Sequence, residues 1–150
     1  MIILGIDPGT ARTGWGVIKK SKLDNGGVEY IGHGCIVTSK EMEMSKRLLL
    51  LRRELRKLLR AHKPNVICIE RIFFGANALT AMTVGQARGV ILLTVAETKI
   101  PSFEYQGLSV KRMLTGSGRS DKKAVQKRVR EFLKVTKKKT PFSAKDGWDD

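Results

Sequence analysis

The sequence predicts an α/β fold with a five-stranded mixed β-sheet flanked by α-helices. Short apolar runs that end in turns alternate with longer segments whose leucines recur every three or four residues. The first three apolar runs are joined by short turns, as in an antiparallel meander, and the fourth follows a helix, as a parallel strand does. No internal repeat or linker divides the chain, so we expect one domain over residues 1–150.

Five segments are predicted to be strands because each is an apolar or β-branched run bounded by turn residues. They span residues 1–7, 13–20, 28–39, 65–70 and 102–105. The sequence "LDNGG" between the second and third strands predicts a hairpin turn. The fourth strand, "NVICIE", is apolar throughout, which is typical of a central strand buried on both faces.

Four segments are predicted to be helices, over residues 42–62, 77–98, about 107–115 and from Ser120 onward. One face of the first helix carries Leu48, Leu51, Leu55, Leu58 and Leu59. Pro64 is predicted to end that helix. The second helix is apolar nearly all round, so we expect it to be buried in the core or against a partner subunit.

The last predicted helix is amphipathic and follows the loop "GSGR". Ser120 is expected to cap it, with Asp121 in its first turn. The residues expected to face inward are Val125, Val129, Phe132 and Leu133. The glycines of the loop and the following helix N-terminus would suit contact with a phosphate, but they also fit an ordinary loop-to-helix junction.

The composition favours a polyanionic partner. Lysine and arginine number 29 against 14 acids, a formal net charge of +15, which points to nucleic acid, although a lysine-rich solvated surface is the alternative. No apolar stretch reaches the length of a membrane span and no signal peptide is evident. Cys35 and Cys68 lie in strand-like runs without metal or redox spacing, which fits a reducing compartment. We therefore expect a soluble, cytoplasmic protein with no membrane contact.

Four acids are candidates for one metal site. Asp7 ends the first strand and Glu70 the fourth, so parallel neighbours would bring both carboxylates to the same edge of the sheet. Asp146 and Asp149 are spaced to share one face of a helix. Such carboxylates would repel one another unless they bound hard cations such as Mg²⁺ or Mn²⁺, and two ions about 4 Å apart would support phosphoryl chemistry on nucleic acid. The alternative is that Asp7 only turns the chain and Glu70 only ends a strand.

Several longer stretches identify a family by their order and spacing. The stretches "ILGIDPGTARTGWGVI", "VICIERIFFGANALTAMTVGQARGV" and "FEYQGLSVKRMLTGSGRSDKKAVQ", followed by the closing acidic segment, resemble the RuvC-type Holliday junction resolvases over nearly the whole chain. The resemblance implies a ribonuclease H-like fold and a two-fold homodimer. It also implies Mg²⁺-dependent cleavage of four-way junctions, with Mn²⁺ as a substitute and a RuvA/RuvB-like branch-migration motor complex as partner.

The same resemblance implies residue roles. Asp7, Glu70, Asp146 and Asp149 match the family's catalytic, metal-binding acids, and Phe73 matches an aromatic residue that stacks on bases near the crossover. The helix that starts near Asn77 matches the dimer contact. The candidate DNA-binding residues are Phe73, Phe74, Asn77, Lys111, Arg119 and Lys122. Because neighbouring side chains on an extended segment alternate, we expect one of Phe73 and Phe74 to face outward and the other inward. The resemblance implies that Phe73 is the exposed one.

The end of the chain departs from the family pattern. It reads "DGWDD", where Gly147 weakens a helix and Asp150 offers an alternative to Asp146 as the partner of Asp149. Three other functions stay open: a related nuclease that cuts another branched or RNA-containing substrate, a catalytically inactive junction-binding module, and an actin-like ATPase. The first phosphate loop of actin-like ATPases resembles "GIDPGT", but those proteins need two such domains and a longer chain.

Overall fold

The strands form one five-stranded sheet in the order β3-β2-β1-β4-β5. The computed structural model describes residues 1–21, 27–71 and 78–135. The strands are β1 (Ile2–Asp7), β2 (Arg12–Lys20), β3 (Val28–Val37), β4 (Val66–Arg71) and β5 (Ser102–Gln106). β1 to β3 pair antiparallel, whereas β4 pairs in parallel with both β1 and β5. The predicted mixed sheet is confirmed; the predicted 23–27 turn lies almost wholly outside the described residues.

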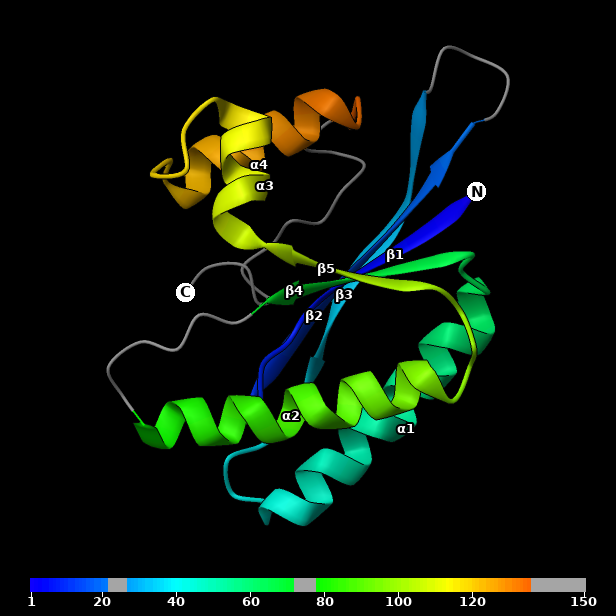
Figure 1. Cartoon of the computed structure of the whole chain (residues 1–150), viewed down its shortest axis with the longest axis vertical. Helices are drawn as coiled ribbons and strands as arrows, with labels where there is room; N and C mark the ends of the chain where they lie inside the picture. Colours follow the sequence, from blue (N-terminus) through cyan, green and yellow to red (C-terminus); the bar gives the residue numbers. More distant parts are fainter. Residues whose placement is uncertain (22–26, 72–77, 136–150) are drawn as a thin grey trace.

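The helices that the structure describes form two pairs, which lie on opposite sides of the sheet. The helices are α1 (Met44–His62), α2 (Ala78–Ala96), α3 (Gly107–Thr115) and α4 (Lys122–Phe132). α1 and α2 pack together and cover one face of the sheet, while α3 and α4 lie on the other side, beyond β5 (Figure 1). Among the described residues, none of the helices combines the length and hydrophobicity needed to cross a bilayer.

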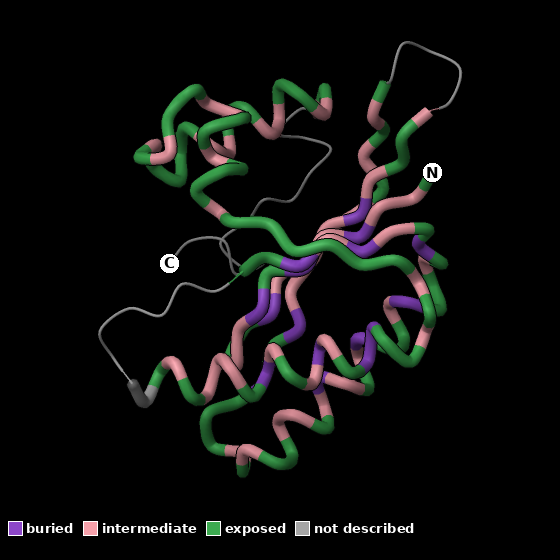
Figure 2. Tube along the Cα trace, in the orientation of Figure 1, coloured by how far each residue is buried: buried purple, intermediate pink, exposed green. Residues whose placement is uncertain are grey.

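The core fills the space between the sheet and the α1–α2 layer. Alternate strand residues point into it, and the buried members are Leu4, Ile6, Val17, Ile36, Ile67 and Ile69. Figure 2 shows buried positions concentrated in this layer. Each fully buried aliphatic side chain contributes about 1.5–3 kcal/mol relative to an exposed one, so this single layer fixes the sheet against its helices.

α1 matches the predicted amphipathic helix. Leu51, Leu55 and Leu59 are buried, and Leu48 and Leu58 pack against the same cluster from its margin. The helix ends at Lys63, whose φ of 45° is left-handed and whose N–H donates to the Leu59 carbonyl over 3.0 Å. Pro64 then prevents another turn, as predicted.

α2 is buried on one side only. Ala87, Ile91 and Val95 lie in the core, whereas Met82 and Leu93 are 65% and 60% exposed. The prediction of a helix buried in the core on all sides is therefore wrong for this chain by itself. The other predicted possibility, an apolar face left for a second subunit, matches the exposed side.

The α3–α4 pair differs from the prediction in two places. Asp121, not Ser120, caps α4, and its carboxylate accepts from the Ala124 N–H over 2.7 Å. Phe132 is 60% exposed rather than inward-facing, while Val125, Val129 and Leu133 are only partly covered. Neither helix contains a buried residue, because the pair packs mainly on itself and on β5 rather than over the core.

No loop separates β5 from α3. Gln106 is the last residue of β5 and also the N-cap of α3, which begins at Gly107. The far end of α3 is fixed to α4, because the Arg128 guanidinium donates to the Leu114 carbonyl over 3.0 Å. The helical pair is therefore attached directly to the edge strand of the sheet.

Candidate active site

Asp7 and Glu70 stand side by side at the carboxyl ends of neighbouring parallel strands. The last ladder pair between β1 and β4 is Ile6 with Ile69, and the two acids are the next residue on each strand. Because side chains alternate along a strand, both acids point away from the face that Ile6 and Ile69 bury. Adjacent strands lie about 4.8 Å apart, which places the two carboxylates on one side of one sheet edge, as the sequence predicted.

The two carboxylates interact electrostatically. Burial raises the pKa of Glu70, the negative charge of Asp7 raises that pKa further, and the ammonium of Lys111 lowers it. Burial also raises the pKa of Asp7. Solvent still reaches both side chains, so water screens part of the repulsion between them. A pair of close, partly desolvated carboxylates is the arrangement that a divalent cation stabilises.

A glycine lies beside each acid, and the one beside Glu70 leaves space that its carboxylate uses. Gly14 lies opposite Asp7 in the β1–β2 ladder, and a Cβ at Gly14 would stand 3.6 Å from the Asp7 Cβ. A Cβ at Gly107, the first residue of α3, would collide with the Glu70 carboxylate unless that carboxylate moved. The Glu70 carboxylate therefore rests against the start of α3.

The predicted DNA contacts fall at two ends of the α3–α4 pair. Lys111 lies one turn into α3 and is close enough to affect the pKa of Glu70. Arg119 and Lys122 lie beyond the other end of α3, which is about 13 Å long. The structure therefore brings Lys111 near Glu70, whereas Arg119 and Lys122 follow the end of α3 that lies away from Gly107 and the Glu70 carboxylate.

The loop that carries Arg119 has its own hydrogen-bond network. Thr115 Oγ1 and Ser120 Oγ lie 2.6 Å apart, and the Arg119 N–H donates to Ser117 Oγ over 3.2 Å. Arg119 itself is exposed. A polar loop held in one conformation beside an exposed guanidinium fits the predicted phosphate contact.

Five of the predicted residues lie outside the described part of the chain: Phe73, Phe74, Asn77, Asp146 and Asp149. The alternative partner Asp150 does as well. Within residues 1–21, 27–71 and 78–135, no three histidine, cysteine or acidic side chains gather as a metal site would require. Asp7 and Glu70 are thus the half of the predicted metal set that the structure describes, and as paired hard oxygen donors they fit Mg²⁺ or Mn²⁺.

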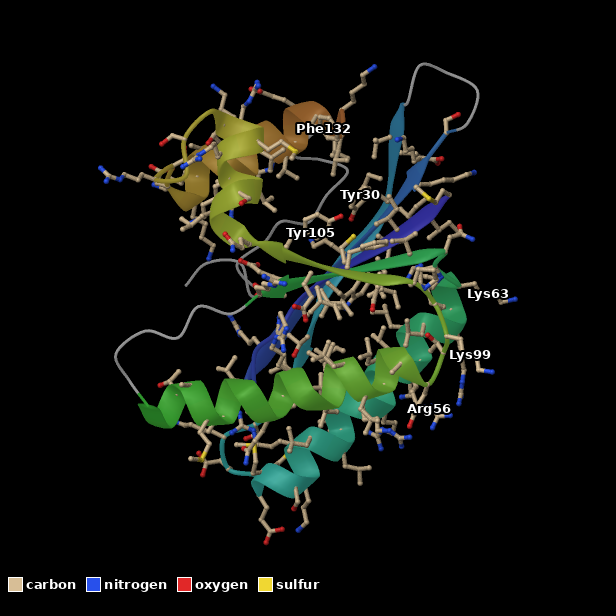
Figure 3. The ribbon with its side chains drawn as sticks, viewed as in Figure 1. Tyr30, Arg56, Lys63, Lys99, Tyr105 and Phe132 are labelled. Carbon is tan, nitrogen blue, oxygen red and sulfur yellow. The ribbon has the colours of Figure 1, made fainter. Side chains whose placement is uncertain are left out.

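Sequence reasoning missed residues that surround this pair. Cys35 lies opposite Gly14, and burial raises the pKa of its thiol, the charge of Arg12 lowers it and that of Asp7 raises it. Tyr105 lies opposite Glu70 on β5 and is 48% exposed. Tyr30, Tyr105 and Phe132 all lie on the side of the sheet that carries α3 and α4, while Arg56, Lys63 and Lys99 lie away from it, near the ends of α1 and α2 (Figure 3). The positions of Cys35 and Tyr105 near the acids follow from the pairing register of the strands, which the sequence pattern does not give.

The sheet order, the central parallel pair and the acids at its edge define a protein of the ribonuclease H-like class. The family model for "Crossover junction endodeoxyribonuclease RuvC" matches residues 3–148. The chain belongs to the RuvC family of crossover junction endodeoxyribonucleases, a family of metal-dependent hydrolases.

Relatives and solved structures agree with this assignment. The chain is 46% identical over 143 residues to a RuvC of Roseiflexus sp. (strain RS-1), covering 95% of this chain and 83% of the relative. It is 44% identical over 147 residues to a RuvC of Petrotoga mobilis, covering 97% of this chain and 88% of the relative. The RuvC structure of Thermus thermophilus superposes with a TM-score of 0.79 at 26% identity, covering 91% of this chain and 82% of that one. A T. thermophilus RuvC in complex with Holliday junction substrate superposes with a TM-score of 0.79 at 24% identity, with 91% and 81% coverage, and it supports the fold.

Proposed function

We propose that this chain, acting as one nuclease domain over residues 1–150, resolves four-way Holliday junctions by paired, symmetric hydrolysis of two phosphodiester bonds. The observation that carries the proposal is the pair Asp7 and Glu70 at adjacent parallel strand ends, in a chain of the RuvC family. The Holliday junction bound by the T. thermophilus RuvC supports the choice of substrate. The net charge of +15 supports a DNA partner of any structure.

We assign Asp7, Glu70, Asp146 and Asp149 to the metal site, with two Mg²⁺ ions per site and Mn²⁺ as a substitute. When bound, such ions would supply a water nucleophile and neutralise charge on the scissile phosphate. Asp7 and Glu70 would hold their oxygens at the sheet edge, where mutual repulsion favours cation binding over two free carboxylates. Lys111 would bind a phosphate oxygen next to Glu70 and lower the cost of keeping that carboxylate ionised.

The remaining candidates would position the DNA. Arg119 and Lys122 would contact the backbone a helix length from the acids, so that the strand runs along α3. Phe73 would stack on an unpaired base, a contact worth about 1–3 kcal/mol, and this assignment rests on the family resemblance alone. Phe74 and Asn77 are the neighbouring candidates for DNA contact, and Phe74 would make it only if it, rather than Phe73, faces outward.

We propose that the working form is a homodimer joined through α2. The exposed side of α2 carries Met82 and Leu93. A Cβ at Gly85 or Gly89 would meet nothing within 4 Å, so the surface there has room for a neighbouring helix. Two sites related by a two-fold axis would account for paired, symmetric nicks. The motor partner, a RuvA/RuvB-like branch-migration complex, is proposed from family membership.

One experiment tests the reaction. The full chain is incubated with a labelled immobile four-way junction and Mg²⁺, with linear duplex of the same sequence as control. Paired nicks at symmetry-related positions in the junction alone are expected. Junction binding without cleavage in Mg²⁺ or Mn²⁺ would indicate an inactive binding module. Preferential cutting of flaps, forks or RNA–DNA hybrids would indicate another nuclease of the same fold.

A further inference from the structure

Glu104 on β5 joins three elements through its two carboxylate oxygens. Oε2 accepts from Arg71 Nε on β4 over 3.1 Å, and Oε1 pairs with the Arg88 guanidinium on α2. The side chains of Glu104 and Arg88 are 29% and 24% exposed, whereas that of Arg71 is 55% exposed. The contact between Glu104 and Arg88 is therefore the more sheltered of the two, and water screens it less.

The strand register places this network directly beneath Glu70. Glu104 lies opposite Ile69 in the β4–β5 ladder, so its side chain points to the α2 side of the sheet. Arg71, two residues after Ile69, points to the same side, and Glu70 between them points to the opposite side. Anchoring Arg71 therefore restricts the backbone on which the Glu70 carboxylate is carried.

Within the part of the chain that the structure describes, the end of β4 is paired with a neighbouring strand on one side only. The ladder between β1 and β4 ends at Ile6 and Ile69, while the ladder between β4 and β5 continues through Glu70–Tyr105 and Arg71–Gln106. Glu70 is thus attached to the sheet on the β5 side. β5 is the last strand in the sheet order and all five of its residues are exposed, so apolar packing over this strand is limited.

We propose that Glu104 is a positioning residue for the metal site. By pairing with Arg88 it holds β5 against α2, and by pairing with Arg71 it holds the end of β4 against β5, so that the Glu70 carboxylate stays beside that of Asp7. Metal ligands must be held to about 0.5 Å, and this network is the described connection between the apolar core layer and the exposed strand end. The inference rests on the metal-dependent cleavage proposed above.

The test compares Glu104→Gln with Glu97→Gln in the full chain. Both variants keep the shape of the side chain; Glu104→Gln removes two ion pairs and Glu97→Gln removes one. Glu97 follows the end of α2, and its carboxylate oxygens both accept hydrogen bonds from Arg52 of α1, over 2.8 and 3.1 Å. The quantities measured are the Mn²⁺ dissociation constant by electron paramagnetic resonance, the melting temperature, the junction dissociation constant without divalent ions, and kcat.

We expect Glu104→Gln to bind Mn²⁺ about tenfold more weakly, the low end of the effect of removing a group that supports a metal ligand. Its kcat should fall and partly recover at high Mn²⁺, while its junction affinity without metal stays unchanged. Glu97→Gln should match the parent protein in Mn²⁺ affinity and kcat. Arg88→Lys, which keeps a cation beside Glu104, should keep more Mn²⁺ affinity than Arg88→Gln.

A lower melting temperature of Glu104→Gln with unchanged Mn²⁺ affinity would overturn the proposal, because a purely structural role predicts that result. If Glu104→Gln fails to fold, Arg71→Gln, which removes only the exposed arm, should still weaken Mn²⁺ binding, and unchanged binding would overturn the proposal. A parent protein that binds Mn²⁺ and never cuts junctions would refute the proposed function without refuting the role of Glu104. A parent protein that binds no Mn²⁺ would overturn both.

Discussion

Asp7 and Glu70 each extend one residue past the last ladder pair of their two parallel strands, and the charge of Asp7 raises the pKa of Glu70. The two side chains therefore lie next to each other just beyond the last backbone pairing of β1 and β4. Their proximity costs free energy while both are ionised and unliganded, and a bound cation reverses that cost. The effect of the pair on stability can be measured in the metal-free protein, and its effect on cleavage can be measured with the metal bound.

Removing either carboxylate should stop cleavage without preventing junction binding. Asp7→Asn and Glu70→Gln keep the side-chain volume but remove a charged metal ligand, so we expect kcat to fall by at least about 100-fold. Junction affinity, measured by gel shift in EDTA, should stay within about threefold of the parent, because phosphate contacts dominate DNA affinity. Cleavage at the parent rate by either variant would contradict the metal-site assignment.

The pair should also impose a pH-dependent cost on the metal-free fold. Because the pKa of Glu70 is raised, the native state binds more protons than the unfolded state between the ordinary pKa of glutamate, about 4.3, and the raised value. The free energy of unfolding contributed by this group therefore falls as pH rises through that window. In EDTA at pH 7.5, Glu70→Gln should melt above the parent, and the difference should shrink toward pH 4.

Glu54 supplies a control of opposite sign for that measurement. A hydrogen bond from Lys57 lowers the pKa of Glu54, so its ionised form favours the fold. Glu54→Gln should not raise the melting temperature at pH 7.5. A Glu70→Gln variant that melts below the parent in EDTA at pH 7.5 would show that the carboxylate pair is not repulsive.

Lys111 should set the acid limb of the cleavage profile. Its ammonium lowers the pKa of Glu70 in the metal-free protein, so Lys111→Gln should raise that pKa, increase the competition of protons with Mg²⁺ and move the acid limb of cleavage to higher pH. The measurement is the single-turnover cleavage rate from pH 5 to 9 at subsaturating Mg²⁺. Lys123→Gln, which changes an exposed lysine in the first turn of α4, serves as the control and should leave the limb in place. A uniform loss of rate at every pH would mean that Lys111 binds DNA without acting on Glu70.

The exposed side of α2 should determine the oligomeric state. Leu93 is 60% exposed in the isolated chain, so Leu93→Glu should fold normally yet disrupt a dimer that buries this side. Light scattering coupled to size exclusion should report a dimer for the parent and a monomer for Leu93→Glu. Met113→Glu, at a position 87% exposed on α3, should remain a dimer. A monomeric parent at micromolar concentration would refute the proposed interface.

Local patterns were sufficient to predict the strands, the helices and the two strand-end acids. "MIILGID" and "NVICIE" each combine an apolar run with a terminal acid, and the parallel pairing of β1 and β4 follows from the helix between them. The end of α1 could also be predicted from the sequence, because Pro64 excludes another helical turn. Features that depend on a residue and its near neighbours in the chain, such as these strands and this helix end, can be predicted from the sequence.

Other features depend on contacts that no local pattern contains. Ser120 and Asp121 are both good caps, and only the backbone geometry selects Asp121. Phe132 fits an inward-facing period, but the α3–α4 pair has no core surface to cover it. Glu104 meets Arg71 and Arg88 across 33 and 16 residues, so its role becomes visible only when β5 is placed beside β4.

The direct junction at Gln106 and Gly107 has a mechanical consequence. A strand that continues into a helix without a loop couples the orientation of the helix to the strand. Here the start of α3 contacts the Glu70 side chain, and the loop after the other end of α3 carries Arg119. A change in the angle of α3 would therefore reach the Glu70 carboxylate through the contact at Gly107, with no loop between β5 and α3 to absorb it.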